Sequence, residues 1–283
     1  MVESQKTRNT RIIWYLLLVV LSATLLMPFI FMISIALTSD ATSTKMQFSL
    51  FPKEFYFSNF AKMFSNPKIL RFLWNSIVIT FFAIVGQVFS SSLVAYGFAC
   101  LRARGKNFLF LLVLSTMMLP SQITMIPQFV IFSKLGWVNT FLPLIIPNFF
   151  GHAFNIFLMR QFITRIPSAI FDAARIDGLG FFGIYRKIIL PLMRPILIAI
   201  AIFTFNSNWG MFMEPLIYLH DEKKMTLSLG IQIMTATSGG EAPPWNMVMA
   251  SSMLLTIPMI IIFFIGQKYI FELNLNTGSS AIK

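Results

Sequence analysis

Charged side chains are scarce in this chain of 283 residues, where they make up 11% of the total, against about 25% in an average soluble domain. Hydrophobic residues make up 57%, and 32 residues are Phe. The single cysteine, Cys100, excludes an internal disulfide framework. This composition is typical of an integral membrane protein and not of a soluble domain.

Groups that carry chemistry are equally rare. His152 and His220 are the only histidines, which speaks against a metal site and against a membrane enzyme, since such an enzyme needs clustered titratable groups. The sequence has no G-x-x-x-x-G-K followed by Ser or Thr, so it lacks a P-loop for ATP. We therefore expect a non-catalytic protein without a metal or a bound cofactor of its own.

Long stretches without Asp, Glu, Lys or Arg divide the chain, the first of them between Arg11 and Asp40. Each has room for about 20 residues of helix, enough to cross a hydrocarbon core about 30 Å thick. Because lipid offers no partners to backbone N–H and C=O groups, the spans must be helical. The sequence thus predicts an all-α membrane protein, one domain over 1–283, with six spans at about 12–37, 72–100, 107–131, 141–160, 195–219 and 246–270. We expect kinks at Pro120, Pro127, Pro143, Pro147 and Pro258.

The positive charges follow the predicted spans. Six spans place both termini on one side, and 14 of the 22 Lys and Arg residues fall on that side, against 8 on the other. The positive-inside rule therefore predicts cytoplasmic termini. The net charge of +12 then reflects topology, and no nucleic-acid partner is expected. Since the first apolar run is too long for a signal peptide, we expect a retained anchor in the cytoplasmic (inner) membrane, surrounded by lipid.

One basic, Gly-punctuated loop interrupts the apolar chain at about 164–194. Pro167 and Ser168 favour a helix start, and Ile170–Asp177 then predicts about two helical turns. Gly178 and Gly180 end that helix, and a second short helix follows at about 181–190. The result is a small helix–turn–helix on the cytoplasmic side, which either docks on a partner or lies on the membrane. Gly178, Gly180 and Gly183 also spell G-x-G-x-x-G, but no strand precedes them, so a dinucleotide site is not expected.

The same loop resembles a known motif. The run from Asp172-Ala-Ala to Gly178, followed after nine residues by Ile188-x-Leu190-Pro191, is similar to the EAA loop of ABC-importer membrane subunits. The segments LWNSIVIT, FNSNWGMFMEPLIYL and PPWNMVMASSMLLTIP resemble the maltose-transporter-type, carbohydrate-uptake permeases. The resemblance extends from about residue 12 to 275. The loop departs from the family in carrying Asp172 where Glu is common, and the tail ELNLNTGSSAIK differs from the family's usual ending.

The resemblance implies a type I ABC importer permease fold and a division of labour among subunits. A separate ATP-binding subunit, present as a dimer, would hold ATP and Mg, and the loop would dock in its cleft, with Asp172 paired to a basic residue and Gly178 setting the helix angle. A second, homologous permease and an extracytoplasmic solute-binding protein would complete the importer. The cargo would be a sugar or oligosaccharide, or alternatively an amino acid, a peptide or an ion. The implied ATPase-coupling residues are Asp172, Ala173, Ala174, Arg175, Asp177, Gly178, Ile188, Leu190 and Pro191.

Polar side chains inside the spans are candidates for a solute path, because such groups tend to face a bundle interior or a water-filled cavity. Asn148, His152 and Asn155 are spaced to lie on one helical face. Sugars are bound by planar hydrogen-bonding groups and aromatic rings, which these residue types provide. The alternative is that they only bond neighbouring helices together. The candidate path residues are Gln87, Gln122, Asn148, His152, Asn155, Asn206 and Trp209.

Overall fold

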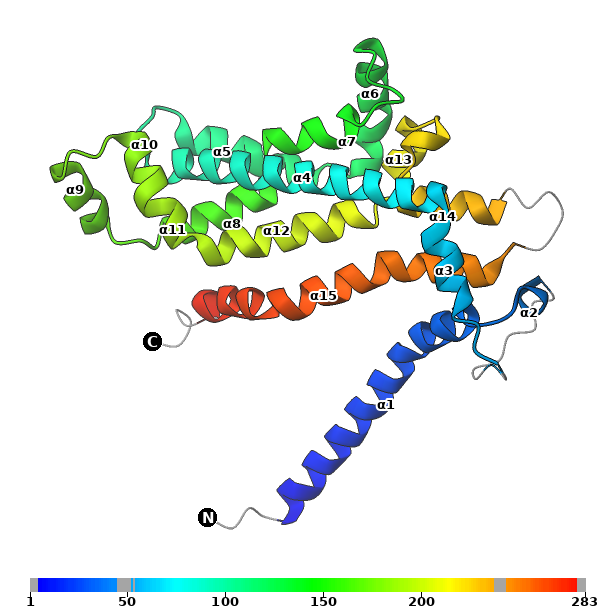
Figure 1. Cartoon of the computed structure of the whole chain (residues 1–283). Coiled ribbons are helices and arrows are strands. Elements are labelled where there is room, and N and C mark those ends of the chain that lie inside the picture. Colours follow the sequence, from blue (N-terminus) through cyan, green and yellow to red (C-terminus); the bar gives the residue numbers. More distant parts are fainter. Residues whose placement is uncertain (1–4, 45–51, 53, 237–242, 279–283) are drawn as a thin grey trace. The chain divides into compact units, whose positions relative to one another are not determined.

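The structure, a computed structural model, describes residues 5–44, 52, 54–236 and 243–278. Within these ranges it consists of helices and their connections, without β-strands (Figure 1). The prediction of an all-α fold is therefore confirmed. The chain divides into two compact units, Met1–Ile69 with Ile231–Leu254, and Leu70–Gly230 with Leu255–Lys283. The single permease domain over 1–283 stays a prediction, and the tail at 279–283 lies outside the described residues.

Four helical segments are long and apolar enough to cross a membrane. They include most of α1 (Gln5–Ala36), all of α4 (Pro67–Cys100) and much of α15 (Trp245–Gly278), together with the segment Leu142–Ile163. The predicted spans at 12–37, 72–100 and 246–270 correspond to the three long helices. Two further spans arise if each of two bent helix pairs is one crossing, which gives up to six among the described residues.

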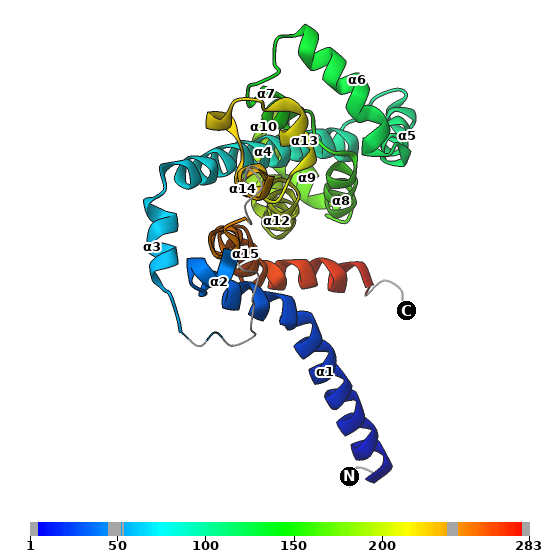
Figure 2. The same ribbon diagram turned by 90° about the vertical axis from the view of Figure 1, so that its right-hand side faces the viewer.

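The span predicted at 107–131 is broken by a sharp bend at Pro120, one of the positions where a kink is expected. The chain forms α5 (Lys106–Ser115), a 3-10 turn η1 (Thr116–Met118) and then α6 (Ser121–Lys134), with a bend of 101° between the two arms. Pro120 lies at the break with an extended backbone, and the residue before a proline is itself biased away from helix. Figure 2 shows α6 turning away from α5.

The next two predicted spans are also interrupted. The fourth consists of α7 (Leu142–Ile145), the 3-10 helix η2 (Ile146–Phe150) and α8 (Ala153–Ile163). Gly151 separates η2 from α8 with a φ of 76°, a conformation that favours glycine. The fifth, predicted at 195–219, ends early: α12 (Arg194–Trp209) stops at Trp209, and a separate α13 (Met213–Tyr218) follows.

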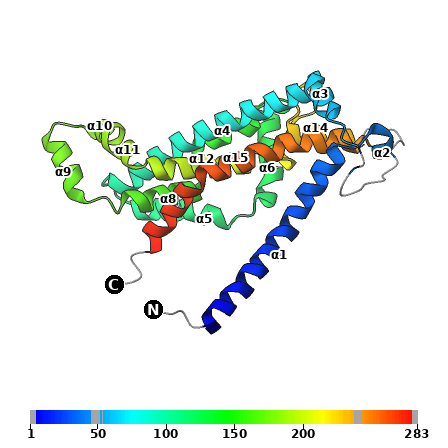
Figure 3. The same cartoon turned by 60° about the horizontal axis from the view of Figure 1, so that its bottom comes forward.

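The loop at 164–194 forms the predicted pair of short helices. The first is α9 (Ser168–Ile176), and Gly178 turns the chain with a φ of 78°. The second begins as α10 (Phe181–Ile184), continues as a π-helix, η3 (Tyr185–Ile189), and ends in α11 (Leu190–Leu192). In Figures 1 and 3 these helices lie at one end of the bundle formed by α4, α8 and α12.

A buried cluster fixes the loop to that bundle. It joins Tyr96 of α4, Met159 of α8 and Ile200 of α12 to side chains of the loop itself, including Ala174 and Ile189. Burial of each large apolar side chain contributes about 1.5–3 kcal/mol. The loop is therefore packed as part of the second unit and is not a loose surface segment.

The far end of α4 is fixed by hydrogen bonds to the segment after α13. Asn75 donates its side-chain N–H groups to the carbonyls of Lys223 (3.0 Å) and Met225 (2.9 Å). Lys223 belongs to a short 3-10 helix, η4 (Glu222–Lys224), and Met225 follows it directly. The backbone N–H of Leu227, which opens α14 (Leu227–Ala236), donates to the Oγ of Ser76 at 2.8 Å. These bonds hold η4 and the start of α14 to α4.

The first unit has its own polar junction. Asn246 of α15 donates to the carboxylate of Asp40 at 2.7 Å and, through its backbone N–H, to the Oγ of Ser43 at 3.0 Å; both partners belong to α2 (Asp40–Thr44). Lys62 of α3 (Ser58–Ser65) pairs with the same carboxylate at 2.9 Å. Hydrogen bonds from Lys62 and Asn246 hold the pKa of Asp40 below its usual value. The junction links α2, α3 and α15 within this unit.

Candidate functional site

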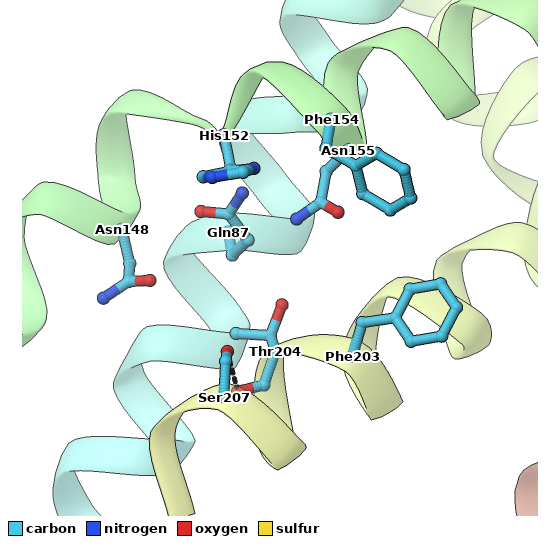
Figure 4. Close-up of a pocket in the computed structure, with 8 residues that line it drawn as sticks. All are labelled: Gln87, Asn148, His152, Phe154, Asn155, Phe203, Thr204 and Ser207. Atoms are coloured by element: carbon cyan, nitrogen blue, oxygen red, sulfur yellow. Dashed lines mark hydrogen bonds between the residues drawn. The ribbon is translucent and has the colours of Figure 1, made fainter. Parts of the chain in front are cut away.

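Two adjoining cavities lie in the second unit, against the broken fourth span and α12; α4 lines the first, and α6 and α13 line the second. The first, the Gln87 pocket, has a volume of about 230 Å³. Figure 4 shows Gln87, His152 and Asn155 gathered on one side of it and the α12 side chains on the other. It is lined by Gln87, Asn148, His152, Phe154, Asn155, Phe203, Thr204 and Ser207.

Gln87 is the hub of this pocket. Its side chain is only 3% exposed. In the amide orientation that satisfies its neighbours, its oxygen accepts from the backbone N–H of His152 (2.7 Å), the Nδ2 of Asn155 (2.8 Å) and the Oγ of Ser91 (3.1 Å), while its nitrogen donates to the carbonyl of Asn148 (3.1 Å). Gln87 thus ties α4 to η2 and α8, as expected if polar residues hold helices together.

Other polar groups of the pocket keep free hydrogen-bonding capacity. The Oγ1 of Thr204 is buried without a partner among the described residues, and a buried polar atom of this kind calls for an explanation such as a missing ligand or water. The imidazole of His152 also has no hydrogen bond to a described residue. The amide of Asn155 uses its nitrogen on Gln87 and leaves its oxygen free. The pocket can therefore act both as a helix junction and as a binding surface.

The second cavity, the Glu214 pocket, has a volume of about 260 Å³. It shares Asn148 and Ser207 with the first pocket, so the two cavities adjoin. Aromatic rings border it, with Phe132 of α6 edge-on to Tyr218 of α13 at a centroid distance of 5.6 Å. It is lined by Gln128, Phe132, Pro143, Leu144, Pro147, Asn148, Ser207, Asn208, Met211, Glu214 and Tyr218.

The structure brings four of the seven candidate path residues together, namely Gln87, Asn148, His152 and Asn155. The reason given for the last three, one continuous helical face, is wrong, because Gly151 breaks the helix between Asn148 and His152. They meet through the break and through Gln87. Their role as a solute path stays a prediction.

The other three candidates lie elsewhere. Gln122 is exposed near the start of α6, and Asn206 is exposed on α12, and neither lines the two pockets. Trp209 is buried and donates its Nε1–H to the carbonyl of Leu255 at 3.0 Å, which bonds α12 to α15 within the second unit. Sequence reasoning missed Thr204 and Ser207. Their spacing of three residues on one span, the same signal that selected the other candidates, could have found them.

The coupling-loop candidates divide into exposed and packed residues. Ile176 is 86% exposed, an unusual position for a large apolar side chain. Asp172 and Arg175 form an exposed ion pair on α9, with Nη1 and Oδ1 3.1 Å apart. Ala174, in contrast, is 3% exposed and faces the core. The exposed candidates are Asp172, Ala173, Arg175, Asp177, Gly178 and Pro191, whereas Ile188 and Leu190 are half-buried and Ala174 is buried.

Two hydrogen bonds attach this loop to α4. The hydroxyl of Ser92 donates to the carbonyl of Phe89 (2.9 Å), so the hydroxyl of Tyr185, 2.7 Å away, donates to Ser92. One turn further along α4, the hydroxyl of Tyr96 donates to the carbonyl of Phe181 at 3.0 Å. The same helix carries Gln87, so α4 contacts both the pocket and the loop.

Comparison with known proteins gives a consistent result. Residues 87–272 match the family described as "Binding-protein-dependent transport system inner membrane component". The arabinooligosaccharides transport system permease protein AraQ of Halalkalibacterium halodurans is 34% identical over 220 residues, 77% of each chain. The sn-glycerol-3-phosphate transport system permease protein UgpE of Brucella abortus is 32% identical over 199 residues, 70% of each chain.

A solved structure is similar over almost the whole chain. It belongs to a bacterial ABC transporter involved in the import of the acidic polysaccharide alginate, with a TM-score of 0.81 and 25% identity, and the match covers 95% of this chain and 99% of that one. This similarity confirms the predicted fold class, the type I ABC importer permease fold.

Proposed function

Because the chain belongs to the family of binding-protein-dependent transport system inner membrane components, we propose that it is the permease subunit of an ATP-driven importer of sugars or oligosaccharides. The family assignment makes it a multi-pass component of the inner membrane. The sugar cargo rests on the relative named for arabinooligosaccharides and on the structural match to an alginate importer. An amino acid, a peptide or an ion is not favoured by these relatives.

The exposed helix–turn–helix around α9 is the main support for the proposal that this chain couples its solute path to a separate ATPase. It presents Asp172, Arg175 and Ile176 to a partner while its other side is packed into the core. A separate ATPase dimer, which holds ATP and Mg, binds this surface. One loop fills one cleft of such a dimer, so a second, homologous permease fills the other, and a solute-binding protein delivers cargo from outside.

Transmission to the solute path follows α4. Movement of α9 and α10 acts on α4 through Tyr185–Ser92 and Tyr96–Phe181. Gln87 lies nine residues before Tyr96, a distance of about 13 Å along the helix. A displacement of the loop therefore acts on the Gln87 pocket through a single rigid element, which fits the rigid-body movements by which alternating access operates.

Uptake and complex assembly together test this function. Cells that express the importer take up labelled arabino-oligosaccharides, and removal of this chain abolishes the uptake. Ile176→Arg places a charge on the most exposed apolar residue of α9 and should release the ATPase in pull-down experiments. Leu135→Arg, at an exposed apolar residue outside both the loop and the candidate spans, should not. Retention of both uptake and ATPase binding by Ile176→Arg would contradict the coupling role.

The orientation of the loop has its own test. In a Cys100→Ala background, a cysteine introduced by Ile176→Cys should react with an impermeant maleimide only in inside-out vesicles. Reaction in right-side-out cells would place the loop outside, where no ATPase could reach it, and would overturn the proposed coupling together with the cytoplasmic termini.

A further inference from the structure

The side chains that line the two adjoining pockets indicate the charge of the cargo. Family membership does not settle this point, because the similar proteins are named for neutral arabinooligosaccharides, for a phosphate ester and for an acidic polysaccharide. This inference rests on the proposed function, and it concerns which of these classes of cargo the lining side chains fit.

The lining is neutral with one exception. No Lys or Arg lines either pocket in the described part of the chain. Most polar lining groups are the amides and hydroxyls of Gln, Asn, Ser and Thr, which bind sugar hydroxyls as donors and acceptors. Two rings, Phe154 and Phe203, flank the Gln87 pocket and offer apolar faces to a sugar. An anionic cargo would find no cation to replace its hydration.

The exception is the carboxylate of Glu214. It lies at the start of α13, is half-buried, and makes no hydrogen bond or ion pair with another residue in the part of the chain that the structure describes. The nearby cation Lys224 does not line the pocket, and its Nζ donates to the carbonyl of Asn139 at 2.7 Å. Glu214 therefore presents an uncompensated negative charge and two acceptor oxygens to the cavity.

From this arrangement we infer that the pockets select uncharged saccharides and reject uronates and phosphate esters, with Glu214 as the specificity-determining residue. Its oxygens accept hydrogen bonds from sugar hydroxyls, and such charge-assisted bonds are about twice as strong as neutral ones. Two like charges about 6 Å apart at an effective dielectric constant of about 20 repel enough to change an affinity about 100-fold.

The test measures binding to the complete transporter. Both permeases and the ATPase are placed in nanodiscs without the solute-binding protein, so that its own selectivity does not enter. The probes are tritiated arabinotriose, maltotriose and trigalacturonate, which have equal numbers of rings. The measurements are made at pH 8, where imidazole groups carry little charge.

Three variants define the outcome. The wild type should bind a neutral trisaccharide about 100-fold more tightly than trigalacturonate. Glu214→Gln should weaken neutral binding about five- to tenfold, because its hydrogen bonds to sugar hydroxyls lose their charge assistance. It should also bring the ratio below about tenfold, because the like-charge repulsion is removed. Glu214→Asp should keep the discrimination. Glu222→Gln, which removes the same charge from η4 outside both pockets, should leave the ratio unchanged.

Equal affinities of the wild type for neutral and acidic probes would overturn the inference, as would a ratio that Glu214→Gln leaves unchanged. If no neutral trisaccharide binds while cells still import saccharides through this chain, the pockets are not the cargo site, and the inference falls while the proposed function stands. Loss of saccharide import in the uptake assay would instead remove the proposed function itself.

Discussion

The hydrogen bond between Tyr185 and Ser92 permits a quantitative prediction, because its two ends are not equivalent. Tyr185 is 2% exposed, and its hydroxyl donates to Ser92, which in turn donates to the carbonyl of Phe89. Tyr185→Phe removes one hydrogen bond and leaves Ser92 with its bond to Phe89. We expect a cost of about 0.5–1.5 kcal/mol.

Ser92→Ala has the larger expected effect, although each substitution removes a single hydroxyl oxygen. It leaves the buried hydroxyl of Tyr185 without an acceptor, and an unsatisfied buried donor costs about 1–3 kcal/mol. The double variant has no unsatisfied group, so it should be no less stable than Ser92→Ala alone, and the two single costs should not add. Ser115→Ala, at the end of α5, is the serine control, because its hydroxyl donates to the carbonyl of Leu112 in its own helix turn at 2.8 Å.

The assay is thermal unfolding of the assembled transporter in nanodiscs, with uptake per ATP hydrolysed as a second readout. The expected order of apparent midpoints is wild type, Tyr185→Phe, then Ser92→Ala. If the bond also transmits movement from the loop to α4, both single variants should transport less substrate per ATP hydrolysed. A larger loss for Tyr185→Phe than for Ser92→Ala, or strictly additive losses, would refute the assignment of donor and acceptor.

Three further predictions concern backbone fit and charge. Gly178 has a φ of 78° and open space around an added Cβ, so a substitution there tests backbone conformation alone. Gly178→Val should lower the free energy of unfolding by at least about 1–2 kcal/mol and weaken ATPase pull-down, whereas Gly178→Asn should be tolerated. Equal effects of the two variants would exclude the conformational explanation. Gly86→Ala would place its Cβ 2.5 Å from the Cδ2 of Phe149. The cost of overpacking, about 1–3 kcal/mol, should outweigh the gain in helix propensity of about 1 kcal/mol, so the variant should be less stable. A rise in the unfolding midpoint would contradict this. The pKa of Asp40 is lowered chiefly by its hydrogen bond to Lys62, so the ionised carboxylate stabilises the protein above its usual pKa, and this effect is lost as the pH falls through the lowered pKa. Asp40→Asn should therefore cost less than about 1 kcal/mol at pH 7 and still less at pH 3, and a cost that grows toward acid would contradict this.

The sequence predicted the long helices better than the interrupted ones, for a physical reason. A run without charges indicates that a segment is apolar enough for lipid, and this was sufficient to predict the long helices α1, α4 and α15. The same signal does not register a change of direction within the membrane. Pro120 indicated a kink, but a bend of 101° depends on packing that the local sequence does not contain.

The candidate site shows the same division. Gln87 and Asn155 could be selected from the sequence because amides in apolar spans are rare and need partners. Their meeting depends on Gly151, whose φ of 76° turns the chain so that η2 and α8 both face α4. Trp209 had the right chemistry but found its partner in the carbonyl of Leu255, about 46 residues away in the sequence, a contact that no spacing rule predicts.

The π-helix η3 limits how this protein can be re-engineered. A π turn accommodates one residue more than an α turn would, and one residue in an α-helix corresponds to a rotation of about 100°. Chimaeras that exchange the helix–turn–helix around α9, the proposed ATPase contact, with that of another importer must therefore carry the junction beyond Leu190. A junction placed between Gly183 and Ile189 would join two segments whose helical phases differ, and the grafted α9 would then be rotated so that a different face points outward.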